Sequence, residues 1–186
     1  MPAGLAGGAE VLDELLVTEL GEAMRWKLSE GWQRRAYSQP LMTRNAPATP
    51  RRKLAVLACM DARLDPARAL GLEEGDAHVI RNAGGVVTED ALRSLAISQH
   101  ELGTEEIVLL HHTKCGMQTI TDEDFAQKLE SETGERPEWR AHTFSDLEED
   151  VRDGIERIRS SPFVPRTDNV RGFVYEVETG RLREVS

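Results

Sequence analysis

Three short, mainly apolar runs stand out along the chain, at residues 54–58, 77–80 and 107–110. Runs of this length and composition predict strands, of which 54–58 is expected to be buried on both faces, as in a parallel sheet, and 107–110 to be a further buried strand. Residues 88–102 instead repeat apolar positions at helical spacing, with Thr88 as a plausible N-cap and Gly103 at the end. Strands therefore alternate with a helix in this part of the chain.

The remaining pattern predicts further helices and a closing hairpin. Cap-forming residues mark three helix starts: Asp65 with Pro66, Thr121 with Asp124, and Ser145 with Glu148. Residues 172–185 read as two strands around a Thr-Gly turn. The order predicts an α/β fold with a mostly parallel sheet flanked by helices, a 2-1-3 strand order in its core, and a C-terminal antiparallel hairpin.

The N-terminal part has a different character. Residues 11–32 place apolar side chains on one helical face: Leu12, Leu15, Leu16, Leu20, Ala23 and Met24. Residues 38–53 hold three prolines and several small polar residues, which predicts a connector. We expect an N-terminal helix and connector over 1–50, with the helix packed on a partner subunit, and a single α/β domain over 51–186.

Chemically distinctive residues follow two of the predicted strands. Cys59 directly follows the first strand, and His112 and Cys115 follow the third. A 2-1-3 order makes these strands neighbours, and ligands bind beyond the carboxyl ends of strands at such a switch point. Two thiols and one imidazole suit Zn²⁺, and three protein ligands leave a catalytic position open. His111 is an alternative ligand, but the spacing of His112 to Cys115 resembles a known pattern.

Asp61 and Arg63 lie two and four residues beyond Cys59. A carboxylate at this position can reach the open zinc position, and a guanidinium can hold a carboxylate through two parallel hydrogen bonds. The pair is therefore a candidate latch: Asp61 held by Arg63 leaves zinc open to water, and Asp61 released blocks it. The alternative is an ordinary surface ion pair of about 0–1 kcal/mol.

Composition narrows the function classes. The net charge of −10 argues against a nucleic-acid groove or an anionic membrane as partner. The first residues contain acids and no basic stretch, which argues against a signal peptide, and no apolar run reaches the ~18 residues of a membrane helix. We therefore expect a cytoplasmic protein whose two cysteines are reduced, which favours metal binding or catalysis over a disulfide.

These motifs resemble the β-class carbonic anhydrases. That family's signature is Cys-x-Asp-x-Arg followed by His-x-x-Cys, here residues 59–63 and 112–115, and Arg81–Gly85 resembles the loop between them. The similarity runs from about Lys53 to about Asp124, and the closing segment from Gly172 resembles the family's terminal strands. The sequence departs from the common family pattern in two places. Residues 115–117 read Cys-Gly-Met where many members have Cys-Gly-Gly, and the stretch after Phe125 is short and polar. Both features resemble a compact bacterial branch that includes carbonyl sulfide and carbon disulfide hydrolases.

The resemblance implies reversible hydration of carbon dioxide to bicarbonate and a proton through zinc-bound hydroxide. It implies one Zn²⁺ per chain on Cys59, His112 and Cys115, with Asp61 and Arg63 as the catalytic dyad, and a homodimer or homotetramer. Two alternatives remain open: a carbonyl sulfide or carbon disulfide hydrolase using the same zinc site, and a zinc-binding module without turnover. Backbone N–H groups near Gly116 and Gly84-Gly85 are candidates for polarising the substrate oxygen.

Overall fold

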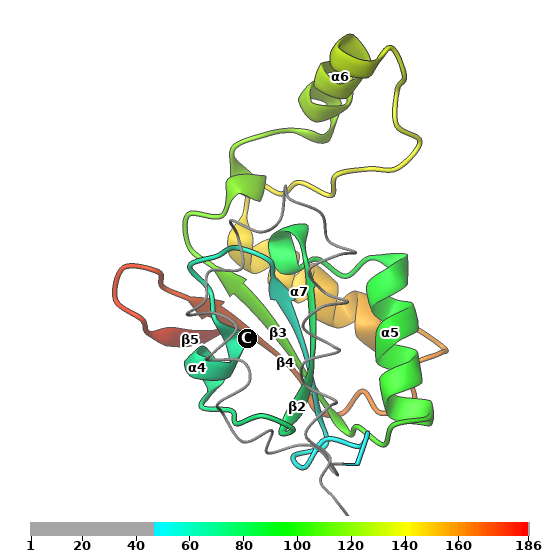
Figure 1. Cartoon of the computed structure of the whole chain (residues 1–186), viewed down its shortest axis with the longest axis vertical. Coiled ribbons are helices and arrows are strands. Elements are labelled where there is room, and N and C mark those ends of the chain that lie inside the picture. Colours follow the sequence, from blue (N-terminus) through cyan, green and yellow to red (C-terminus); the bar gives the residue numbers. More distant parts are fainter. Residues whose placement is uncertain (1–46, 186) are drawn as a thin grey trace, which may run out of the picture. The chain divides into compact units, whose positions relative to one another are not determined.

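The computed structural model describes residues 47–185. Five strands form one sheet in the order β2-β1-β3-β4-β5 (Figure 1). Their bounds are β1 Leu54–Cys59, β2 Ala77–Asn82, β3 Glu106–His112, β4 Val170–Tyr175 and β5 Leu182–Val185. The first four strands run parallel, and β5 returns antiparallel to β4. The predicted 2-1-3 core and the closing hairpin are both confirmed.

Helices connect the strands in the predicted order. They are α4 Pro66–Leu70, α5 Glu89–His100, α6 Asp122–Thr133 and α7 Leu147–Arg159, with single 3-10 turns η1 at Ala83–Gly85 and η2 at Gly116–Gln118. Asp65, Thr88 and Thr121 cap their helices as expected. At α7 the cap is Asp146, whose carboxylate accepts from two backbone N–H groups, and not Ser145. The amphipathic segment 11–32 lies outside the described residues.

The two central strands are buried on both faces, as their unbroken apolar sequences predict. Four of the apolar positions of β1, from Ala55 to Ala58, have no exposed surface. On one face α5 and α7 pack on the sheet, and Gly154 in α7 lets that helix approach Leu109 and Val87 closely. On the other face a second apolar cluster forms around Leu64 and Leu110 and includes Cys59 and Cys115.

The segment between β3 and α7 departs from this layered plan. In Figure 1, α6 stands away from the sheet at the end of a long excursion, and none of its residues is buried. Phe125 in α6 contacts Trp139 in the loop that follows the helix, with 6.3 Å between the ring centroids. Across the described residues, no helix has both the length and the apolar character that crossing a bilayer requires.

Candidate metal centre

The parallel pairing of β1 with β3 brings the two sequence motifs together. Ala58 is registered opposite Leu110, so the ends of the two strands lie at the same edge of the sheet. Cys59 ends β1, His112 ends β3, and Cys115 follows within three residues. All three side chains are buried. Because side chains alternate along a strand, His112 faces the same side as Leu110, and His111 faces the opposite side.

The three candidate ligand atoms form a compact group. The Sγ atoms of Cys59 and Cys115 lie 4.0 Å apart, and all three ligand atoms lie within 4.8 Å of one another. Two thiolates bound tetrahedrally to one zinc would lie about 3.8 Å apart. The spacing therefore fits a single Zn²⁺ without rearrangement of the cysteines.

The hydrogen bonding of His112 also fits a metal ligand. Its Nδ1 lies 3.0 Å from the Thr113 carbonyl oxygen, which can only accept, so Nδ1 carries the ring hydrogen. Nε2 is then left with a lone pair, and it is buried without a hydrogen-bond partner. A buried lone pair without a donor is costly unless something binds it. The donor set of two sulfurs and one such nitrogen suits zinc.

His111, the alternative ligand, has a different partner. Its Nε2 lies 2.7 Å from Asp150 Oδ2 in α7, and its ring packs at 5.6 Å from the Phe144 ring. It is not part of the compact group of potential ligands. The structure thus separates the two neighbouring histidines onto opposite faces of the sheet.

The two thiols do not have equivalent acidity. A hydrogen bond from Cys115 is the main reason that the pKa of Cys59 falls to about 4, and His112 adds to the effect. The same hydrogen bond raises the pKa of Cys115. Burial lowers the pKa of His112, but the nearby Cys59 sulfur and the hydrogen bond to the Thr113 carbonyl outweigh it, so that the net shift is upward. The site therefore already stabilises a thiolate in its interior.

Asp61 and Arg63 lie at the rim of this group. Two guanidinium nitrogens of Arg63 bind the two carboxylate oxygens of Asp61, at 2.9 and 2.7 Å. Asp61 Oδ2 also lies 3.7 Å from His112 Nε2, the atom with the free lone pair. The side-chain hydrogen bond from Arg63 holds the pKa of Asp61 well below its usual range. An anionic carboxylate therefore stands beside the position that a metal would occupy.

A glycine turn closes the space behind Cys59. Gly84 and Gly85 lie in η1, and both have positive φ, at 82° and 75°. A Cβ on Gly85 would lie 2.8 Å from the backbone nitrogen of Cys59 and 3.3 Å from the Leu110 carbonyl oxygen. Only glycine permits both this conformation and this approach. The turn thus packs directly on the strand ends that carry the site.

Two contacts of the site could not be predicted from the sequence. Arg63 Nη2 donates to the Lys114 carbonyl at 2.9 Å, and Lys114 adopts a positive φ of 58°. The Thr113 hydroxyl accepts from the Val177 backbone N–H, which ties the loop after β3 to the hairpin. Both contacts involve backbone groups, which carry no residue-specific pattern. They connect the two motif loops to each other and to the end of the chain.

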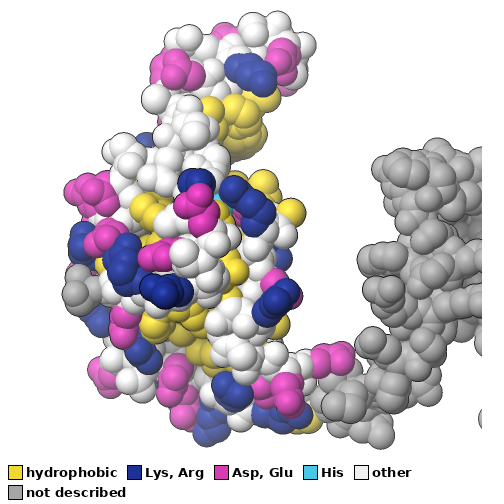
Figure 2. All heavy atoms as spheres, turned by 90° about the vertical axis from the view of Figure 1, so that its left-hand side faces the viewer, with side chains coloured by type: hydrophobic (Ala, Val, Ile, Leu, Met, Phe, Trp, Pro, Cys, Tyr) yellow, Lys and Arg dark blue, Asp and Glu magenta, His cyan; other side chains and the backbone are white. Residues whose placement is uncertain are grey.

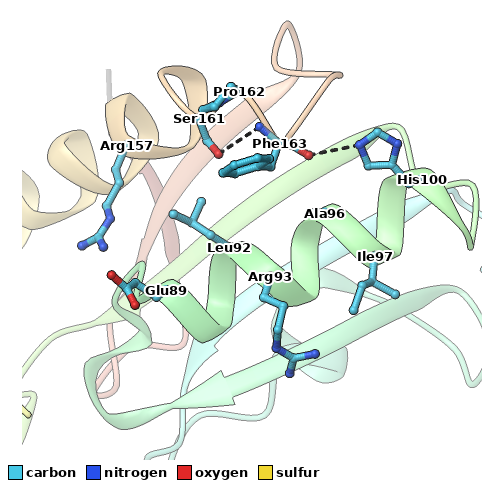
Figure 3. Close-up of a pocket in the computed structure, with 10 residues that line it drawn as sticks. All are labelled: Glu89, Leu92, Arg93, Ala96, Ile97, His100, Arg157, Ser161, Pro162 and Phe163. Carbon is cyan, nitrogen blue, oxygen red and sulfur yellow. Dashed lines mark hydrogen bonds between the residues drawn. The ribbon is translucent and has the colours of Figure 1, made fainter.

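A further cavity lies elsewhere on the surface. It measures about 710 Å³ and lies between α5 and the turn at Ser161–Phe163 (Figure 3). Leu92, Ala96 and Ile97 line it from the helix, and His100 at the end of α5 is turned toward the Phe163 carbonyl, 3.2 Å from its Nε2. None of the three candidate zinc ligands lines this cavity. This cavity is therefore separate from the candidate metal centre.

Comparison with known proteins agrees with the site. The family model for carbonic anhydrase matches residues 54–182. Beta-carbonic anhydrase 1 of Mycobacterium tuberculosis is 56% identical over 140 residues, covering 75% of this chain and 86% of that protein. A carbon disulfide hydrolase of an Acidianus species is 36% identical over 157 residues, covering 72% and 77%. The crystal structure of carbonic anhydrase from Streptococcus mutans superposes with a TM-score of 0.74 at 37% identity, over the full length of both chains. The chain belongs to the β-carbonic anhydrase family.

Proposed function

We propose that this protein catalyses the reversible hydration of carbon dioxide to bicarbonate and a proton, with one Zn²⁺ per chain held by Cys59, His112 and Cys115. The observation that carries the proposal is the position of Asp61, whose Oδ2 lies 3.7 Å from the free nitrogen of His112. A site that only held a metal for stability would need no carboxylate there. The 56% identity to a mycobacterial β-carbonic anhydrase supports the same activity.

Zinc bound here would supply the Lewis acidity that makes a water-derived nucleophile available near neutral pH, as it does in carbonic anhydrases with other zinc ligands. The residues of the chain do the rest. Asp61, kept anionic by Arg63, accepts a hydrogen bond from the attacking water and turns its lone pair toward the carbon of carbon dioxide. The hydroxyl group from water and the three atoms of carbon dioxide leave together as bicarbonate, and the other proton of water passes to buffer.

The neighbourhood of the site suits a small apolar substrate. Cys59 and Cys115 lie within an apolar cluster, against which Met117, Phe144 and Phe173 also pack. Apolar surroundings exclude competing water and strengthen electrostatic interactions at the reacting atoms. Carbon dioxide, which has no net charge or dipole, enters such a region at little cost in desolvation.

Hydrolysis of carbonyl sulfide or carbon disulfide is the second candidate function. The observation that favours it is the 36% identity to carbon disulfide hydrolases over about 70% of the chain. The substrates are also linear molecules with an electrophilic carbon. The higher identity to a β-carbonic anhydrase makes hydration of carbon dioxide the first choice.

Stopped-flow hydration of carbon dioxide, run beside sulfide release from carbonyl sulfide and from carbon disulfide, decides between the candidates. We expect rapid hydration and slow sulfide release. Rapid sulfide release with negligible hydration would establish the second function instead. Zinc that binds stoichiometrically while all three substrates remain unconverted would identify a zinc-binding module without turnover. Elemental analysis of the purified protein supplies the zinc content for each comparison.

We further propose a homodimer or homotetramer and a cytoplasmic location. Figure 2 shows hydrophobic side chains exposed between charged ones on the face seen there. Trp139 and Met60 are 61% and 64% exposed, and they are candidates for contact with a partner subunit. The two free cysteines are consistent with a reducing compartment. Light scattering during gel filtration tests the oligomer, and a tagged full-length chain tests the location.

A further inference from the structure

The side chain of Arg81 reaches across the end of the sheet to the loop that carries half of the proposed site. Arg81 lies on β2, the edge strand beside β1. Its Nε and Nη2 lie 3.1 and 2.9 Å from the Cys59 carbonyl oxygen. Nη2 also lies 2.8 Å from the carbonyl oxygens of Asp61 and Leu64. One guanidinium therefore donates to three carbonyl groups within the six residues 59–64.

These three carbonyl groups define the course of the loop. The Leu64 N–H donates to the Asp61 carbonyl at 3.1 Å, which makes the loop a tight turn around the guanidinium. The Met60 N–H donates to the Asn82 carbonyl at 2.8 Å and joins the start of the loop to β2. With the peptide groups fixed in this way, the direction in which each side chain leaves the backbone is fixed as well.

We propose that Arg81 is a positioning residue for the hydration reaction: it holds the backbone of residues 59–64 so that the Asp61 carboxylate stands beside His112 Nε2. This inference rests on the proposed function. The side-chain hydrogen bonds of Arg81 go to these carbonyl oxygens, so Arg81 reaches the reacting groups through the backbone of the loop. Placement within about 0.5 Å is what supporting residues provide to reacting groups.

The chemistry of the guanidinium explains why arginine serves at this position. Its nitrogens donate in fixed, coplanar directions, whereas a lysine ammonium is a single point on a flexible stem. Arg81→Lys should therefore keep one or two of the contacts and lose the geometry of the set. Arg81→Met retains the length and apolar stem of the side chain and removes every donor.

Arg51 offers a matched control at the opposite end of β1. Its side chain also anchors a loop, since Nε lies 2.9 Å from Asp76 Oδ1 and Nη2 lies 3.0 Å from the Glu74 carbonyl oxygen. Arg51 precedes β1, whereas Arg81 acts beyond its last residue. Arg51→Met thus removes a comparable set of hydrogen bonds without touching the loop that carries Asp61.

The test compares Arg81→Met, Arg81→Lys and Arg51→Met with the unmodified zinc-loaded protein. We expect kcat per bound zinc to fall about 10- to 100-fold in Arg81→Met, with KM within about twofold, as for supporting residues at other metal sites. Arg81→Lys should lie between, and Arg51→Met should keep the kcat of the unmodified protein. Hydrogen exchange of the amides from Met60 to Asp65 should accelerate at least about tenfold in Arg81→Met only.

Three outcomes would overturn the inference. The first is a kcat per bound zinc in Arg81→Met within twofold of the unmodified protein. The second is a loss of activity that only follows a loss of zinc. The third is an equal loss of activity in Arg51→Met, which would indicate a general effect on stability. If the unmodified protein does not hydrate carbon dioxide, the proposed function fails, and the exchange rates alone still show whether Arg81 fixes the loop.

Discussion

Asp61 and Arg63 are joined by two nearly parallel hydrogen bonds, one from Nε at 2.9 Å and one from Nη2 at 2.7 Å. The same carboxylate accepts from the Arg63 backbone N–H at 2.9 Å. Nη2 continues to the Lys114 carbonyl, which belongs to the loop between His112 and Cys115. The pair therefore links the two loops that carry the proposed zinc ligands, and it fixes a negative charge close to them.

Replacing Arg63 by alanine should release that carboxylate. Asp61 stands close enough to the proposed zinc position to turn toward it once the two hydrogen bonds are gone. We expect Arg63→Ala to retain zinc, because no ligand is removed, and to lose about 10- to 100-fold in kcat, because Asp61 then takes the place that water needs. Stopped-flow hydration together with elemental analysis measures both quantities.

Arg63→Ala, Asp61→Asn is the informative companion variant. The amide is a poorer zinc ligand than a carboxylate, so the double variant should block the site less than Arg63→Ala does. It should nevertheless remain below the unmodified protein, since an amide orients water less well. If Arg63→Ala kept the turnover of the unmodified protein, the latch would play no part in the mechanism.

The proposed zinc ligands make a second prediction. Cys115→Ser and His112→Gln each leave two ligands for the metal, and we expect bound zinc to fall by about tenfold or more in both. Hydration activity should fall in parallel, because the remaining steps depend on the metal. Zinc content after dialysis against a weak chelator distinguishes these variants from the unmodified protein.

His111→Gln is the matched control for His112→Gln. His111 points to the opposite face and lies 2.7 Å from Asp150 Oδ2. Its replacement should leave zinc content unchanged and reduce stability by about 1–3 kcal/mol, the usual cost of breaking a buried hydrogen bond to a charged group. Loss of zinc in His111→Gln with retention in His112→Gln would reverse the assignment of the two histidines.

Much of this arrangement follows from local patterns in the sequence. Apolar runs specify β1 and β3, and the order of strands and helices restricts how they can be wound. Cys59 and His112 then meet because each stands at the end of one of two neighbouring strands. Short apolar runs and chain order are properties that a single sequence displays directly, which is why the sheet and the meeting of the motifs could be predicted.

Contacts made by the backbone could not be predicted in the same way. Any residue can supply the carbonyl that Lys114 offers to Arg63, and nothing in the sequence marks it. The partner of His111, Asp150, lies 39 residues away on a helix whose side chains face several directions. Asp146 caps α7 because its carboxylate accepts hydrogen bonds from two backbone N–H groups, although Ser145 and Glu148 have the capping-box spacing. Tertiary geometry decides each of these cases.

The glycine turn behind Cys59 gives a third prediction. Gly85→Ala introduces a Cβ about 2.8 Å from the Cys59 nitrogen at a positive φ, so both the backbone and the strand end must shift. We expect a loss of stability of about 2–4 kcal/mol and weaker zinc binding. Thermal unfolding of the zinc-loaded protein measures the first effect and competition with a chelator the second.

Gly116→Ala provides the comparison within the same site. Gly116 follows Cys115, but apart from its own chain neighbours no residue lies within 4 Å of the position that its Cβ would take. This variant should fold and bind zinc as the unmodified protein does. If Gly85→Ala proved as harmless as Gly116→Ala, the close approach of the turn to β1 would not matter for the site.

The fourth prediction concerns stability at low pH and depends on Asp76, the last residue before β2. Its carboxylate accepts from the Glu73 N–H at 2.9 Å and lies 2.9 Å from Arg51 Nε and 3.2 Å from Arg52 Nε. The hydrogen bond from Glu73 and those from Arg51 outweigh the effect of burial and lower the pKa of Asp76 below 3.8. Folding thus favours the anion.

A pKa that is lower in the folded state contributes stability above pH 3.8, and the contribution disappears as the pH falls through the folded value. Asp76→Asn should therefore melt several degrees below the unmodified protein at neutral pH, and the difference should close as the pH falls through the folded pKa of Asp76, below which both proteins carry a neutral group. Asp90→Asn, which removes an exposed ion pair with Arg93, should change little at either pH. A melting difference for Asp76→Asn that persisted at low pH would show that the shape of the side chain, and not its charge, stabilises the loop before β2.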